Sequence, residues 1–323
     1  MKSLAALLSR IGRHGTLLAA LSIFIGLSVP GLPALLKPTL GTVIVLMLIL
    51  AFLRVDPTAL KGYFRRPGLI AAATVWLMLV TAGLLGLLFL FSGVDRALPG
   101  LYFMLVLQIS APALMSAPAM AALLGLDVAL TLATLIVSVA VTPLTAGLFS
   151  HFLLGHALAS PLALGLRLFL IIIGSALAAI VIRRIAGGNR IEAQRARIDG
   201  LSVLMFMTFA VAAMDGVTAH AISDPRLIGE LTLIAFALSL GMTAVTTLVF
   251  WPAGRARAFA IGVMAGNRNM GLMLTATGFA IPQTAWLYFA VAQFPIYLLP
   301  HLMRPLARRL TAPPGERSGD RRH

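Results

Sequence analysis

The sequence predicts an all-helical integral membrane protein, and three observations lead to this fold class. Hydrophobic residues make up 60% of the 323 residues and charged residues only 11%, and the mean hydropathy is +0.99. Apolar runs of about 20 residues, the length that a helix needs to cross about 30 Å of hydrocarbon, recur along the chain. Basic residues gather in the connections between these runs, as is typical of membrane proteins. This composition excludes a soluble packed domain.

Successive apolar runs predict ten membrane spans joined by mostly short connections. The first run follows Lys2, Arg10 and Arg13 and is similar to a secretory signal, but we find no convincing small-residue cleavage site before Pro30 and expect it to be retained as a span. The predicted spans cover residues 15–30, 36–53, 68–92, 98–124, 127–149, 160–182, 198–220, 227–250, 257–280 and 284–303.

The distribution of basic residues predicts the orientation of these spans. Of the 25 Lys and Arg residues, 20 lie at the termini and in alternate connections, whereas the other connections hold only Lys37, Arg96 and Arg226. Because basic connections stay in the cytoplasm, both termini are expected there, in a multi-pass protein of the bacterial inner-membrane type. The same alternation excludes a nucleic-acid partner as the reason for the net charge of +15.

The most charged connection, RRIAGGNRIEAQRAR, divides the chain into two halves of five spans. An odd number of spans per half places the halves in opposite orientations, as in inverted-repeat transporters. We therefore expect residues 1–182 to hold the first repeat and the sixth span, and residues 183–303 to hold spans seven to ten. The basic segment 304–323 is expected to be a disordered tail.

The fourth predicted span contains two prolines, Pro112 and Pro118, with Gln108, Ser110 and Ser116 around them. Proline removes an amide donor and clashes with the carbonyl one turn earlier, so this pair predicts a broken or kinked helix. Backbone groups freed in this way are tolerated at membrane depth only where they face protein or a wet cavity. A proline kink supported by neighbouring helices is the alternative.

The ninth predicted span is interrupted by the sequence GNRNMGL, which places Asn267, Arg268 and Asn269 inside an apolar run. Paired interruptions in the two halves are a sequence pointer to a transport site near the bilayer midplane. An arginine at the centre of a span costs at least about 2.5–3.5 kcal/mol, so something must offset its charge. The candidates are a substrate carboxylate, helix C-terminal carbonyls, or an ion pair with Asp215.

Thr131 and Thr134, in the fifth span, can supply hydroxyl ligands beside the first break or bond their own helix carbonyls. The chain has no cysteine, which excludes thiolate metal sites and cysteine nucleophiles. Its 10 acidic residues are scattered along the chain and do not form the carboxylate cluster that an intramembrane enzyme would need. We expect neither catalysis nor a metal site.

Several segments resemble the bile acid:sodium symporter family and its wider superfamily of anion transporters. They are Pro112, the run DVALTL (127–132), GNRNMGL (266–272) and LAFLRVDPTALKGYFRRP (50–67). The resemblance implies ten helices in a panel and a core domain, with discontinuous helices four and nine crossing, and alternating access. It also implies an organic anion as the substrate.

The sodium ligands of that family do not carry over. Ala117 and Pro118 stand where the family has a Ser-Asn pair, and Leu135 where it has a hydroxyl. Met264 replaces its acidic residue and Arg268 its glutamine, whereas Thr131 and Asn269 are retained. The hard oxygen ligands of a small cation are therefore largely missing. We hypothesise that Arg268 replaces bound sodium.

The predicted function is thus secondary transport of a small organic anion with weakened or absent sodium coupling. Arg268, Asn267 and Asn269 are expected to contact the substrate or shape its cavity, opposite a broken helix formed by Gln108, Ser116 and Pro118. Asp215, with Thr131 and Thr134, is the candidate for ion or proton coupling. A metalloid efflux carrier of the same superfamily and a membrane sensor without turnover are the alternatives. Oligomeric state is not predicted.

Overall fold

The computed structural model describes residues 15–55, 62, 64–155 and 160–311, and within these ranges the chain forms helices and no strand. The prediction of an all-helical protein is confirmed. Lys2, Arg10 and Arg13, which precede the first predicted span, lie outside the described residues. Six helical segments among those described are long and apolar enough to cross a membrane: Leu32–Leu53, Pro67–Phe91, Val128–Leu154, Pro161–Ala186, Arg195–Ser223 and Pro225–Val249.

Several helices in the first half of the chain begin at a proline or directly after a glycine. Proline stands in the first turn of several of them, where its missing amide costs nothing. In chain order the elements of this half are α2 (Gly15–Ser28), α3 (Leu32–Leu36), η1 (Lys37–Thr39), α4 (Leu40–Leu53), α6 (Pro67–Val75), the π-helical turn η2 (Trp76–Val80), α7 (Thr81–Phe91), α8 (Val94–Ala97), α9 (Pro99–Ser110), α10 (Ala117–Leu123), α11 (Val128–Phe149) and a second π-helical turn, η3 (Ser150–Leu154).

In the second half of the chain, proline again stands in the first turn of several helices. Its elements are α12 (Pro161–Ala186), α13 (Gly188–Ala193), α14 (Arg195–Ala213), α15 (Val217–Ser223), α16 (Pro225–Val249), η5 (Trp251–Ala253), α17 (Arg255–Gly266), α18 (Met270–Thr277), α19 (Gln283–Val291), α20 (Gln293–Leu302) and α21 (Arg304–Thr311). Every predicted span contains helix in the structure. The arrangement of ten spans as an inverted repeat stays a prediction.

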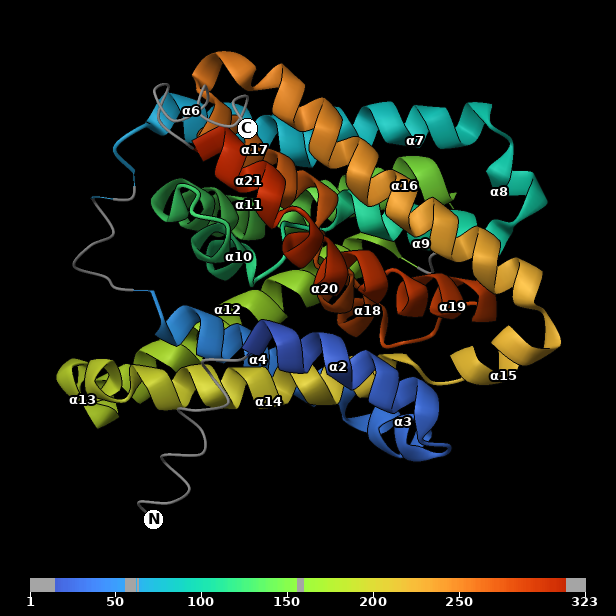
Figure 1. The fold of residues 1–323 in the computed structure, drawn as a ribbon, viewed down its shortest axis with the longest axis horizontal. Helices are drawn as coiled ribbons and strands as arrows, with labels where there is room; N and C mark the ends of the chain where they lie inside the picture. The colour runs from blue at the N-terminus through green and yellow to red at the C-terminus, as the bar shows by residue number, and fades with distance from the viewer. Residues whose placement is uncertain (1–14, 56–61, 63, 156–159, 312–323) are drawn as a thin grey trace, which may run out of the picture.

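The helices lie in two layers (Figure 1). In the first layer, α14 packs against α2, α3 and α4, and α12 packs against α4. The second layer holds α6 to α11 and α16 to α20, in which α16 packs against α17 and α9 against α19. α18 contacts α4 and α12, so the second broken span lies at the interface between the layers.

Both predicted interruptions are present. The helix of the fourth span ends at Ser110 and resumes at Ala117, and that of the ninth ends at Gly266 and resumes at Met270. The residues between the half-helices are extended and pair with each other through an antiparallel bridge between Ala113 and Arg268. The two broken spans therefore cross, because each supplies backbone hydrogen-bond partners that the other lacks.

Two glycines of the ninth span have a packing role that the sequence analysis did not assign. A Cβ atom placed on Gly262 would lie 2.6 Å from the carbonyl oxygen of Thr243, and one on Gly266 would collide with the same threonine and with the Ser239 carbonyl. These glycines, one turn apart on α17, let its backbone approach α16 closely, as small residues do between membrane helices.

One sequence prediction about the charged segments is wrong. Residues 304–311 are not disordered but form α21, which buries Ala307 and packs against α17; residues 312–323 lie outside the described residues. The charged connection between spans six and seven is also mostly helical, because α12 continues to Ala186 and α13 and α14 follow after short turns. Arg183 is held there by the carbonyl oxygens of Leu53 and Val55 at 3.2 and 2.9 Å.

Candidate functional site

The crossing of the two broken spans is fixed by backbone hydrogen bonds. The amide of Leu114 donates to the carbonyl of Asn267 at 3.0 Å, and the amide of Asn269 donates to the carbonyl of Pro112 at 2.9 Å. Proline and asparagine suit this segment because neither continues a helix readily. The half-helices α9 and α17 thus end at the crossing, and α10 and α18 begin there.

Arg268 lies at the centre of this crossing and is only 3% exposed. Its guanidinium donates to four oxygen atoms: the carbonyls of Ala265 at 3.0 Å, Ala111 at 3.1 Å and Leu77 at 2.8 Å, and the hydroxyl of Thr81 at 3.0 Å. A fifth, longer contact of 4.0 Å reaches the sulfur of Met78. Since a guanidinium has five N–H groups, all of them have a partner within the protein.

The charge of Arg268 is offset by backbone dipoles. Ala265 belongs to the last turn of α17, and Ala111 follows the last residue of α9. The C-terminal end of a helix carries a partial negative charge on its unpaired carbonyls, which attracts a cation. Of the three candidates from the sequence, helix C-terminal carbonyls are confirmed. The predicted ion pair between Arg268 and Asp215 is wrong, because the carboxylate of Asp215 contacts Lys37 instead.

The asparagines on either side of Arg268 shape the ends of the two half-helices. The side-chain oxygen of Asn269 accepts a hydrogen bond from the amide of Leu272 at 3.1 Å and so caps the N-terminus of α18. The side-chain amide of Asn267 donates to the carbonyl of Val263 at 2.8 Å, and its side-chain oxygen is buried with no hydrogen-bond partner among the residues that the structure describes. Asn267 therefore retains one unused acceptor.

A cavity of about 30 Å³ lies beside the crossing, between the two layers. Arg268, Asn269, Gln293 and Tyr297 contribute polar groups to its lining from the second layer. The apolar lining comes from both layers and includes Ile44, Met47, Met115, Phe206, Phe209 and Met270. Because about 10–15 Å³ of such volume holds one water molecule, this cavity admits water but no organic molecule in the present conformation.

The remaining residues predicted for the first broken span are placed differently. Gln108 is buried and accepts a hydrogen bond from the hydroxyl of Tyr288 at 2.6 Å, and it shares with Arg268 a separate cavity of about 10 Å³. Ser116 and Pro118 lie at the start of α10 and do not line the central cavity, which Leu114 and Met115 reach instead. Their contact with substrate stays a prediction.

Thr131 and Thr134, the two threonines of α11 selected from the sequence, are buried. The hydroxyl of Thr131 bonds the carbonyl of Val128 at 2.9 Å, the local alternative that the sequence left open. The hydroxyl of Thr134 has no partner among the described residues. Among those residues there is also no group of three His, Cys, Asp or Glu side chains that could hold a metal ion.

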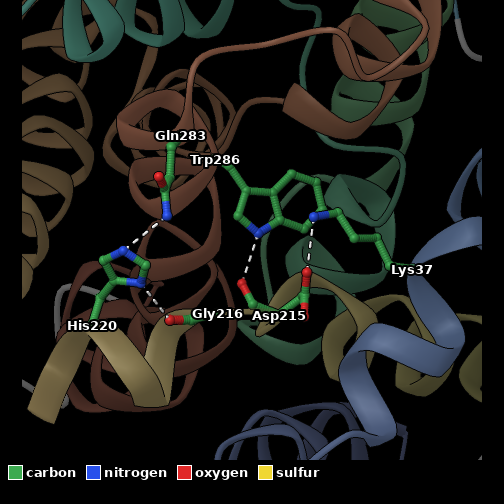
Figure 2. A network of polar contacts seen from close by, with 6 residues as sticks. All are labelled: Lys37, Asp215, Gly216, His220, Gln283 and Trp286. Atoms are coloured by element: carbon green, nitrogen blue, oxygen red, sulfur yellow. Dashed lines mark hydrogen bonds and ion pairs between the residues drawn. The ribbon is translucent and has the colours of Figure 1, made fainter.

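Asp215 lies away from the crossing, in the turn between α14 and α15. Its carboxylate contacts the ammonium of Lys37 at 2.8 Å, and its carbonyl accepts a hydrogen bond from the indole of Trp286, also at 2.8 Å (Figure 2). Both side chains of the ion pair are partly open to solvent, with 42% of Lys37 and 24% of Asp215 exposed. Asp215, the candidate for ion or proton coupling, thus belongs to a polar cluster that is separate from the crossing.

The sequence analysis missed Leu77 and Thr81, which supply two of the four oxygens around Arg268. They lie in and directly after the π-helical turn η2, and π-turns occur often at functional sites. The turn contains no proline or glycine that would have predicted it. The hydroxyl of Thr81, inside an apolar run, was the signal that the sequence offered for a polar contact here. Comparison with known protein families and with curated proteins finds no match to this chain.

Proposed function

We propose that this protein is a secondary transporter of an organic anion that works by alternating access between its two layers. The single observation that carries the proposal is the guanidinium of Arg268, buried where two broken spans cross at the layer interface. Burial of a permanent positive charge at membrane depth costs free energy, and such charges commonly mark substrate pathways. Broken helices that cross near the middle of the protein support the same function.

Arg268 takes the place of a coupling cation in this proposal. Four oxygens converge on its guanidinium, three of them backbone carbonyls, and hard oxygens of this kind are the ligands that small cations such as sodium prefer. The guanidinium already occupies these oxygens, so a sodium ion does not fit the same position. Transport would then be independent of sodium and driven by protons, with Asp215 as carrier, or by the substrate gradient.

The lining of the central cavity suits an amphiphilic anion. Methionine and aromatic side chains from both layers would contact an apolar body, and methionine adapts its shape readily to different partners. Asn269 and Gln293 supply polar groups to the same lining. Because all N–H groups of Arg268 are engaged, its positive charge would attract the anion through the field and not through a direct hydrogen bond.

The small volume of the cavity is consistent with a carrier between substrate-accessible states. Residues from α4 and α14 face residues from α18 and α20 across it, so a shift of one layer against the other would enlarge it. Such rigid-body movement is the usual course of alternating access in transporters with broken helices.

Uptake by purified protein in lipid vesicles tests the proposal. A panel of labelled carboxylates and sulfonates is offered with an inward sodium gradient and again with potassium in place of sodium. We expect saturable uptake of at least one anion at the same rate in both salts. A strict sodium requirement would contradict the role given to Arg268, and binding of an anion without any flux would identify a sensor instead of a carrier.

A further inference from the structure

A polar cluster far from Arg268 joins the two layers at one end of their interface. We call the cluster the latch and define it as Lys37, Asp215, His220, Gln283 and Trp286 (Figure 2). These residues surround a hollow of about 290 Å³, far larger than the central cavity. The volume is open enough for solvent to reach it, in agreement with the partial exposure of the Lys37 and Asp215 side chains.

Three contacts of the latch join α19 to the first layer or to α15. The indole of Trp286, on α19, donates to the carbonyl of Asp215, in the turn after α14. The amide of Gln283, at the start of α19, lies 2.9 Å from Nε2 of His220 on α15. The ammonium of Lys37, on η1, sits 4.2 Å from the centre of the Trp286 ring. Polar and cation–π contacts here thus hold α19 against the first layer.

α15 contacts both layers, because it packs against α16 and α19 and also against α2. It follows α14 after a turn at Gly216, and the hydroxyl of Thr218 donates to the carbonyl of Leu27 in α2 at 2.8 Å. Nδ1 of His220 bonds the carbonyl of Gly216 at 2.8 Å, which fixes the ring so that Nε2 faces Gln283 (Figure 2). The α15 side of the latch is therefore a preformed surface.

The latch and the central cavity lie at successive depths along the same helices. Ile44 lines the cavity seven residues after Lys37, Phe209 six residues before Asp215, and Gln293 seven residues after Trp286. At about 1.5 Å of rise per residue, each of these three paths separates the latch from the cavity edge by about 10 Å. The latch thus stands between the cavity and one end of the interface.

The predicted orientation makes this the external end. Lys37 lies in a connection predicted outside, as do the connections after α15 and before α19. We propose that the latch is the external gate of the transporter: its cross-layer contacts must break before the cavity can open outward. This inference rests on the proposed transport function, but the contacts themselves are testable without any substrate.

The contacts have the strength that a reversible gate requires. A net intramolecular hydrogen bond shifts an equilibrium only modestly, and partly exposed groups regain water when they separate. Loss of both hydrogen bonds that α19 makes in the latch is expected to raise the population of the outward-open state on the order of ten-fold. The Lys37–Asp215 pair joins two residues of the first layer and can remain intact while the gate opens.

The natural absence of cysteine makes the gate directly measurable. Leu287→Cys places a thiol in the hollow at a residue that is 2% exposed. In sealed cells, a membrane-impermeant maleimide applied outside should label this thiol slowly. In the same background, Trp286→Phe with Gln283→Ala removes both donors that α19 supplies to the latch but leaves Asp215 and Lys37 unchanged, and it should raise the labelling rate on the order of ten-fold.

Arg226→Gln with Glu230→Gln is the matched control, because it removes a 2.8 Å ion pair within α16 that does not join the layers. A latch variant that labels at the rate of the parent and of this control overturns the proposal, as does labelling only from the cytoplasmic side. Spin labels at Ser223 and Thr284 provide a second measurement: their separation should increase in the latch variant and stay unchanged in the control. A failed uptake assay with normal labelling results would instead count against transport.

Discussion

Replacement of Arg268 with glutamine tests the centre of the proposed mechanism. The change removes one positive charge and the hydrogen bonds to four oxygens at 2.8–3.1 Å. With an effective dielectric constant of about 20, a unit charge about 6 Å from a bound carboxylate contributes about 2.8 kcal/mol. Affinity for the anion should therefore fall about 100-fold.

The free energy of unfolding should fall by less than the loss of four buried hydrogen bonds would imply on its own. Unpaired buried carbonyls cost about 1–3 kcal/mol each, but water from the adjacent cavity can replace part of the lost bonding. The desolvation cost of the buried charge, several kcal/mol, disappears at the same time. We expect a net loss of about 1–3 kcal/mol, measured by thermal unfolding in detergent, with ligand binding measured on the same sample.

The same variant should acquire a response to sodium that the parent lacks. The oxygens of Ala111, Ala265, Leu77 and Thr81 would be free to bind a small cation, and a sodium concentration of 100 times Kd would add about 2.7 kcal/mol of stability. Thermal unfolding in sodium chloride and in potassium chloride of equal ionic strength measures this gain. Arg167→Gln is the control, because that exposed arginine makes only a 3.4 Å bond to a helix-end carbonyl. An unchanged anion affinity in Arg268→Gln, or equal stabilisation of the parent by sodium, would refute the reasoning.

Two further predictions concern packing around the crossing. Gly262→Ala should lower the free energy of unfolding by about 1–3 kcal/mol, because its Cβ would meet the Thr243 carbonyl at 2.6 Å. Gly174→Ala is the control and should be neutral or stabilising, because its Cβ would have no neighbour within 4 Å. Equal unfolding midpoints of the two variants in detergent would disprove the close approach of α17 to α16. Tyr288→Phe leaves the side-chain oxygen of Gln108 without its 2.6 Å donor and should cost about 1–2 kcal/mol by the same measurement, and an unaltered midpoint would show that water replaces the hydroxyl.

The amino-acid sequence by itself determined the membrane class, the helical fold and the positions of both interruptions. These features depend on local properties: the length of an apolar run, the missing amide of proline, and the weak helix propensity of glycine and asparagine. Pro112 and the segment 267–269 could therefore be recognised without knowledge of their neighbours in space. The helical α21 was missed because its basic composition resembles a disordered tail, and burial of Ala307 decided the outcome.

Only the tertiary structure decided which groups meet the polar side chains. Arg268 bonds Ala111 and Leu77, which lie 157 and 191 residues away in the chain, and Asp215 pairs with Lys37 at a separation of 178. A buried charge must find compensation, but sequence pattern does not say whether a carboxylate or the carbonyl ends of helices will provide it. Here the crossing of two broken spans brings several backbone dipoles to one point, and this convergence, which arises from packing, stabilises the guanidinium.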